Sequence, residues 1–445
     1  MLPPEILSRV LEYRTSERDL VAATHVCQYW RSTLTSSPSL WSYFRFTSGH
    51  NADRTVTYLE RSKSAPIDVS IDMVFFQNSE VLQYFAPHIA RTRSLIIQGS
   101  RGDISAASLL FCNPTTSLQH LGLLVYEGLV RLPDNFLGQQ VPSLRSVRFS
   151  GIYLTPVSTF PLPNLTEFSL YLPQEGGPFH MSALFRYFSC CPRLQKLCIG
   201  AASAVLQGGL DEAISLESLV ELDYAYKSAD RILPFLRLPR LKKLRVHSSS
   251  GSGQVQKAVD RLPYGGHVLL TGATDMVYFS DQSSLRVDFS GNGTDVTFIT
   301  FGTTVDPITV DWFSDETCIP FGRIEDLKVE GWLTDTDFPI NTFALENLGI
   351  LRVSRWEAEF IEKFLRLFHP DPGAGVPCQS LREIDFIHLG LEESSRRSLI
   401  SLVRERKRAG HQLRLLRLST VQESHQDLAE ELRKHVAEVR LRVYV

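Results

Sequence analysis

The sequence predicts an α/β chain in which three short helices are followed by an irregular solenoid whose parallel strands line a concave face. Two observations carry this prediction. Apolar residues recur at helical spacing over the first 46 residues, and one triplet of apolar residues recurs ten times after residue 67. With 445 residues, 43% of them hydrophobic, the chain is long and apolar enough to bury more than one core.

The first 46 residues have the pattern of three amphipathic helices. The Pro3-Pro4 pair suits a first helical turn, and an apolar stripe follows from Ile6 to Leu11. A second helix is expected over 19–34, because apolar residues recur there every three or four positions. The Ser37-Pro38 pair is expected to begin a third helix over 38–44. Three such helices bury little surface alone, so this unit either caps the next domain or binds a partner.

The motifs of this unit resemble the F-box in order and spacing. They are Leu2-Pro3-Pro4-Glu5-Ile6-Leu7, Asp19-Leu20, Val26-Cys27-Gln28-Tyr29-Trp30-Arg31 and Ser37-Pro38-Ser39-Leu40-Trp41. The resemblance implies a docking unit for a Skp-type adaptor, which links F-box proteins to a cullin-RING ubiquitin ligase. The wider pattern resembles the large F-box families of mushroom-forming fungi. The docking residues that the resemblance implies are Leu2, Pro3, Ile6, Leu7, Val10, Leu20, Val26, Cys27, Trp30, Leu40 and Trp41.

Two features depart from the F-box pattern. Arg14 stands where family members usually carry an apolar residue, and the loop over 14–18 is about one residue longer than usual. The motif also begins at Met1, which is compatible with a fragment or a shortened start. Either departure would weaken adaptor binding.

We expect an F-box at 1–46, a linker at 47–66 and an irregular leucine-rich-repeat domain at 67–445. Alternating apolar residues from Ile67 to Met73 predict the first strand of that domain. Beyond it, an apolar residue is repeatedly followed by apolar residues three and five positions later. Successive anchors lie about 21 to 33 residues apart, except for one gap of about three periods between the sixth and seventh copies. The ten triplets are Leu118-Leu121-Leu123, Leu144-Val147-Phe149, Leu165-Phe168-Leu170, Leu194-Leu197-Ile199, Leu219-Leu222-Tyr224, Leu241-Leu244-Val246, Ile324-Leu327-Val329, Leu348-Leu351-Val353, Leu381-Ile384-Phe386 and Leu413-Leu416-Leu418.

Ten triplets at a leucine-rich-repeat period predict stacked units, because each short strand can bury its apolar side only against its neighbours. The consensus Asn or Cys three residues beyond each strand is missing, so we expect irregular curvature. Between the sixth and seventh triplets, 250–320 contains four apolar runs, either degenerate repeats or an inserted β-element. A helix over 423–439 is expected to cover the last repeat.

Residues that alternate with the buried ones should face the concave side, because strand side chains have a period of two. Their mixed charges favour a protein substrate over nucleic acid, which would favour a continuous basic stripe. The plainer interpretation is a solvated surface. The candidate substrate contacts are Lys196, Glu221, Asp223, Lys243, Arg245, Asp326, Lys328, Arg352, Glu383 and Asp385.

Composition excludes several other functions. The formal net charge of -3 attracts no nucleic acid, and no apolar run is long enough to cross a membrane. Seven scattered cysteines indicate reduced thiols, hence cytoplasm or nucleus. Cys190, Cys191 and Cys198 cluster but lack a fourth ligand at metal-binding spacing, so no metal and no cofactor is expected.

No catalytic motif is present in the sequence. The first hypothesis is therefore a non-catalytic adaptor of the ubiquitin-like conjugation pathway, the substrate receptor of an SCF-type ligase. The second is a repeat scaffold that binds proteins independently of any ligase. The third is an enzyme with its active site within 250–320, which a deep polar pocket there would support.

Overall fold

The structure is a computed structural model of the whole chain. The chain forms two compact units, Met1–Ser218 and Leu219–Val445, hereafter unit 1 and unit 2. The residues that the structure describes are 2–12, 17–46, 52–73, 83–110, 112, 114–133, 136–153, 162–172, 179–201, 206–207, 213–226, 235–248, 273, 275–280, 284–291, 294–301, 321–331, 342–354, 358–370, 373, 375–387, 391–420 and 426–443.

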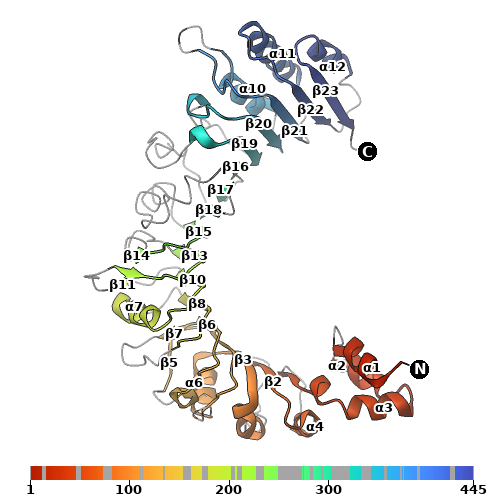
Figure 1. Cartoon of the computed structure of the whole chain (residues 1–445), viewed down its shortest axis with the longest axis vertical. Helices are drawn as coiled ribbons and strands as arrows, with labels where there is room; N and C mark the ends of the chain where they lie inside the picture. Colours follow the sequence, from red (N-terminus) through yellow and green to blue (C-terminus); the bar gives the residue numbers. More distant parts are fainter. Residues whose placement is uncertain are drawn as a thin grey trace. The chain divides into compact units, whose positions relative to one another are not determined.

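Unit 1 begins with short helices and continues as strands (Figure 1). Its helices are α1 (Pro4–Glu12), α2 (Glu17–Ala23), α3 (Gln28–Thr35), α4 (Ala52–Ser62), α6 (Arg101–Leu110) and α7 (Met181–Ser189), with 3-10 helices η1 (Pro38–Trp41), η2 (Ala86–Arg91) and η3 (Phe136–Gln139). Its strands are β1 (Tyr43–Phe46), β2 (Ile67–Asp72), β3 (Thr92–Gly99), β4 (His120–Val125), β5 (Val130–Arg131), β6 (Ser146–Ser150), β7 (Ile152–Tyr153), β8 (Glu167–Leu172), β9 (Phe179–His180), β10 (Lys196–Ala201), β11 (Leu206–Gln207) and β12 (Ile214–Ser215).

The N-terminal helices differ from the prediction in two places. The expected helix over 19–34 is wrong, because a turn at Thr24–Val26 divides it into α2 and α3. Thr24 Oγ1 donates to Val21 O (2.6 Å), which ends α2, and the extended Cys27 caps α3 by accepting from Trp30 N (3.5 Å). The third helix is also shorter than expected, because η1 ends at Trp41 and strand β1 follows.

The main sheet of unit 1 contains seven parallel strands in the spatial order β1-β2-β3-β4-β6-β8-β10, which is also their chain order. Small parallel pairs, β5 with β7 and β9 with β11, lie beside it. Helix α6 contacts β3, β4 and β5 and covers the apolar face of the sheet. Strand β1 comes directly from the N-terminal helices, so those helices are continuous with the sheet. Helix α4 occupies the segment that we expected as a linker.

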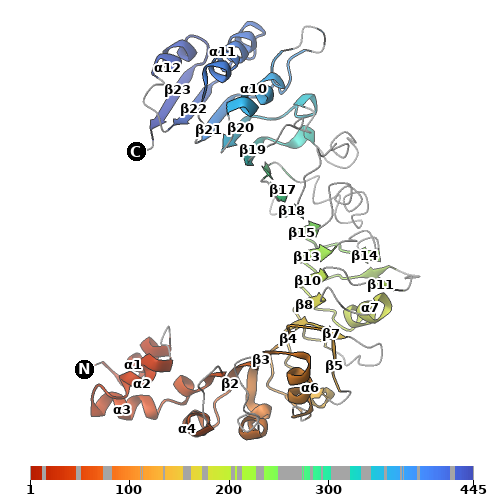
Figure 2. The same cartoon turned by 180° about the vertical axis from the view of Figure 1, so that it is seen from behind.

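The described residues of unit 2 form strands and, mostly towards the C-terminus, helices (Figure 2). The helices are α10 (Ala358–Arg366), α11 (Glu393–Arg408) and α12 (Gln426–Arg433), with 3-10 helices η7 (Phe321–Arg323) and η8 (Thr342–Ala344). The strands are β13 (Glu221–Tyr226), β14 (Leu236–Arg237), β15 (Lys243–Ser248), β16 (Asp275–Ser280), β17 (Ser284–Gly291), β18 (Thr294–Phe301), β19 (Asp326–Gly331), β20 (Ile350–Ser354), β21 (Glu383–Ile387), β22 (Leu415–Thr420) and β23 (Glu438–Val443).

The spatial order in unit 2 is β13-β15-β18-β17-β16-β19-β20-β21-β22-β23. Strand β17 runs antiparallel to β16 and β18, and these three strands form a meander whose order in the sheet is reversed. This antiparallel pairing distinguishes the meander, which lies within 250–320, from the parallel strands on either side.

The C-terminal end also departs from the prediction. The expected helix over 423–439 is wrong in its second half, because α12 ends at Arg433 and strand β23 pairs with β22. Val439 and Leu441 align with Leu416 and Leu418, so β23 adds one more strand to the parallel series.

The apolar triplets are the core of both units, as predicted. All thirty of their residues are buried, with relative exposures of at most 6%. Strand register places equivalent residues side by side, for example Val147 beside Phe168 in unit 1 and Leu351 beside Ile384 in unit 2. The charged and polar residues between them therefore share the opposite face of each sheet, which we call the open face.

The turns before the strands repeat one hydrogen-bond pattern in both units. Arg145 O accepts from Thr166 N (2.8 Å) and Glu167 N (2.9 Å), and Gly349 O accepts from Arg382 N (2.9 Å) and Glu383 N (3.0 Å). Side chains that precede an anchoring leucine add to it. Asn164 Nδ2 donates to Pro142 O (2.8 Å), Ser218 Oγ donates to Pro192 O (2.9 Å), and Asn347 Nδ2 donates to Gly322 O. Side chains in the turns before the strands thus make polar contacts with the neighbouring turns.

Gly151 occupies a position between β6 and β7 that no other residue fits. Its φ is +67°, and a Cβ there would lie 2.7 Å from Val125 Cβ and 2.9 Å from Gly128 O. We expect Gly151→Ala to destabilise unit 1 by at least about 2 kcal/mol, since backbone strain and overpacking add. Gly128→Ala is the matched control, because Gly128 has a φ of +79° but a Cβ there would lie 3.7 Å from its nearest neighbour, Arg101 Cδ, which is an ordinary contact distance. Equal shifts of the urea midpoint in the two variants would contradict the packing argument.

Candidate functional site

The N-terminal helices carry a concentration of exposed apolar side chains. Among the described residues, ten large hydrophobic side chains are exposed, and half of them lie between residues 2 and 26. Soluble proteins scatter such residues, so a concentration of them indicates an interaction surface. They are Leu2 (52%), Ile6 (45%), Val10 (59%), Val21 (37%) and Val26 (62%), and we call them the apolar surface.

The helices are held together beneath this surface by a small core. Leu7, Ala23 and Leu34 from α1, α2 and α3 are buried against one another, and four partly buried hydrophobic residues pack around them. Tyr29 Oη donates to Leu2 O (2.6 Å) and so fixes the start of the chain on α3. A core of this size stabilises little by itself, which fits a unit that is continuous with the sheet of unit 1.

The structure divides the predicted docking residues into three groups. Leu2, Pro3, Ile6, Val10, Val26 and Cys27 are exposed, Trp30 and Leu40 are partly buried, and Leu7, Leu20 and Trp41 are buried. Buried side chains can support a docking surface but cannot contact a partner. The sequence reasoning missed Val21, which is exposed on α2. It stands next to Leu20, and only the position of the helix shows which of the two faces solvent.

Trp41 is the largest buried side chain of this region, with 0% exposure. Its Nε1 donates to Leu34 O (2.8 Å), and its ring meets Tyr58 edge to face at 5.0 Å. The Arg61 guanidinium lies 4.3 Å above the ring centroid, in cation–π contact. Trp41 therefore connects α3 with α4 and fixes the N-terminal helices against the rest of unit 1.

The candidate substrate contacts lie on the open face, with Lys196 in unit 1 and the other nine in unit 2. Neighbouring strands of unit 2 pair opposite charges. Lys243 Nζ lies 3.5 Å from Glu221 Oε1, and Arg352 Nη1 lies 2.6 Å from Asp326 Oδ2. Arg417 Nη2 lies 3.2 Å from Glu383 Oε2, and its Nη1 lies 3.7 Å from Asp385 Oδ2.

Among the described residues of unit 2, these ion pairs compensate several of the charges on the open face. Burial raises the pKa of Asp385, against the opposing effect of nearby Arg417 and Arg352. Each partly exposed pair contributes about 0–1 kcal/mol to stability, so the network positions side chains more than it stabilises the fold. Such a surface suits a partner of mixed polarity.

No group of three or more His, Cys, Asp or Glu side chains within the described residues could hold a metal ion. Burial raises the pKa of Cys191 and of Cys378 to about 12, so neither thiol is a nucleophile at neutral pH.

No helix in the described segments is long and apolar enough to cross a membrane. Arg14 and most of 250–320 outside the meander lie outside the described residues.

Residues 1–47 match the model of the F-box-like family. This match supports an F-box protein and covers the same helices that carry the apolar surface. No curated protein matches the chain.

Proposed function

We propose that the apolar surface binds a Skp-type adaptor and, through it, a cullin, so that the chain is the substrate-receptor subunit of an SCF-type ubiquitin ligase. The observation that carries this proposal is the F-box-like match to residues 1–47, where six of the ten large hydrophobic residues that are exposed in the described part of the chain lie. F-box domains are adaptor modules, so the chain itself performs no chemistry. It contributes proximity, by holding a substrate lysine near a charged conjugating enzyme.

The remaining part of the chain is proposed to be an irregular leucine-rich-repeat solenoid with a concave substrate-binding face. The buried triplets and the repeated turn hydrogen bonds of both units support it. A protein substrate would lie on the open face, where Lys196, Glu221 and Arg352 belong to the candidate contacts. The ion-paired surface of unit 2 favours a protein of mixed polarity over a nucleic acid.

Calorimetry with the Skp-type adaptor tests the proposal. The full chain is expected to bind with a submicromolar Kd, and Val26→Glu, at an exposed position, is expected to abolish binding while the circular dichroism spectrum stays unchanged. No binding by the folded wild-type chain would reject the ligase proposal. A repeat scaffold that acts independently of a ligase would then be the better description.

Thiol labelling tests whether the adaptor contacts the chain at the N-terminal helices. Cys27 is exposed, whereas Cys191 and Cys378 are buried. We expect adaptor at about ten times its Kd to slow alkylation of Cys27 about tenfold, since only the unbound tenth of the chain reacts. Partly buried Cys190 in unit 1 is the internal control, and its rate should not change. Unchanged labelling of Cys27 in a chain saturated with adaptor would place the contact elsewhere.

A further inference from the structure

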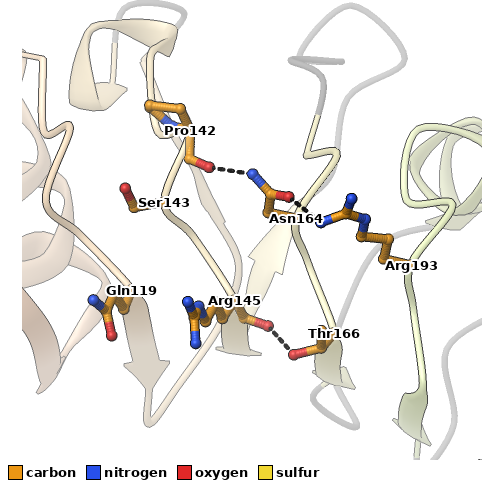
Figure 3. Close-up of a pocket in the computed structure, with 7 residues that line it drawn as sticks. All are labelled: Gln119, Pro142, Ser143, Arg145, Asn164, Thr166 and Arg193. Atoms are coloured by element: carbon orange, nitrogen blue, oxygen red, sulfur yellow. Dashed lines mark hydrogen bonds between the residues drawn. The ribbon is translucent and has the colours of Figure 1, made fainter.

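A pocket of about 400 Å³, lined mainly by polar residues, lies in unit 1, at the turns that precede β4, β6, β8 and β10 (Figure 3). It is at the edge of the sheet where these strands begin. Four successive turns contribute to its walls. The lining residues are Gln119, Pro142, Ser143, Arg145, Asn164, Thr166 and Arg193.

Hydrogen bonds fix the wall of the pocket. Asn164 Nδ2 donates to Pro142 O (2.8 Å), and Asn164 Oδ1 accepts from Arg193 Nη1 (2.9 Å). Thr166 Oγ1 donates to Arg145 O (3.0 Å). Asn164 thus joins neighbouring turns and orients the Arg193 guanidinium at the same time, as Figure 3 shows.

The pocket contains positive charge without an acidic counterpart. None of its lining residues is Asp or Glu. Within the part of the chain that the structure describes, the Arg145 guanidinium makes no ion pair, and the Arg193 guanidinium has a single side-chain partner, Asn164. A guanidinium carries five N–H donors, so most of these donors are free. The open face of unit 2 differs, because Arg352 and Arg417 there are paired with carboxylates.

We propose that this pocket binds an oxyanion, such as a phosphate group, with Arg145 and Arg193 as its cationic residues. Two guanidinium groups match the geometry and charge of tetrahedral oxyanions, and the hydroxyl of Ser143 and the amide of Gln119 are further donors. The pocket is larger than one phosphate, so it has room for atoms that carry the group. The anion is either free or attached to a polypeptide.

Calorimetry at physiological salt tests the site on the full chain without adaptor. The probes are inorganic phosphate, a short neutral peptide with one phosphoserine, and the same peptide with serine. The test variant is Arg145→Gln with Arg193→Gln. The control variant is Arg186→Gln with Arg237→Gln, because these two arginines are exposed, lie outside the pocket and give the same change in net charge.

The test variant is expected to bind phosphate or phosphopeptide about a hundredfold more weakly than wild type, since each charge-assisted pair contributes about tenfold. The control variant is expected to bind as wild type does. Tighter binding of phosphopeptide than of phosphate would identify a polypeptide source, and equal binding would identify the free anion. Equal loss in both variants, or no binding of either probe by wild type, would overturn the proposal. Neither result depends on adaptor binding.

Discussion

Replacing Ile6 and Val10 together by glutamate is expected to weaken adaptor binding more than a hundredfold. Both side chains are exposed one turn apart on α1, at 45% and 59%. Each contributes about 1.5–3 kcal/mol when a partner buries it, and a tenfold change in Kd corresponds to about 1.4 kcal/mol. The buried carboxylates add a desolvation penalty. Calorimetry with the adaptor measures the loss.

The fold should survive this double substitution. Glutamate is a good helix former, and exposed positions usually change stability by about 0.5 kcal/mol or less. The matched control is Tyr84→Glu with Phe343→Glu, which adds two charges at similarly exposed aromatic positions. Adaptor affinity that falls equally in both double variants would show a nonspecific charge effect. Unchanged adaptor affinity in the Ile6→Glu, Val10→Glu double variant would show that the apolar surface is not the docking site.

The sequence predicted the buried triplets well, because the pairing of parallel strands imposes a strict requirement on them. A strand between two parallel neighbours can bury only alternate residues, and a preceding leucine closes each turn. Leu165, Phe168 and Leu170 show the consequence, with exposures of 0%, 2% and 0%. The same requirement does not determine which hydrogen bonds join neighbouring turns. The hydrogen bonds that the side chains of Asn164 and Ser218 donate were therefore not predicted.

Helix boundaries were less predictable, because apolar spacing continues across breaks. Ala23 and Cys27 are four residues apart, as in one helix, but a turn of three residues separates α2 from α3. Leu428, Leu432 and Val436 likewise extend a helical stripe past the end of α12. In both places local hydrogen bonding or a neighbouring strand decides the boundary. The spacing of apolar residues predicts neither the local hydrogen bonds nor the neighbouring strand.

The candidate site could be predicted by position but not by exposure. The F-box resemblance selected apolar residues on the helices that carry the apolar surface, yet some of them are buried beneath this surface and others form it. Leu7 and Ile6 are neighbours in the chain with exposures of 1% and 45%. The packing of three helices decides between them. Leu7→Ala therefore tests folding of the unit, and Ile6→Glu tests docking.

Replacing Trp41 by alanine is expected to release the N-terminal helices from the rest of unit 1. Removal of a fully buried tryptophan usually costs about 3–5 kcal/mol. Hydrogen exchange measures the local effect. If the free energy of local unfolding falls by this amount, amides of α3 and α4 should exchange at least about a hundredfold faster. Amides of β19 to β22, in unit 2, are the internal control and should keep their protection.

Trp41→Phe separates the ring from its hydrogen bond. A phenyl ring preserves the edge-to-face contact with Tyr58 and the cation–π contact with Arg61, but Leu34 O loses its indole donor. An unsatisfied buried carbonyl costs about 1–3 kcal/mol, so exchange in α3 should lie between that of wild type and Trp41→Ala. Adaptor affinity should follow the same order, because docking requires ordered helices. If Trp41→Ala left the exchange of α3 unchanged, the N-terminal helices would be stable without α4, and Trp41 would not connect them.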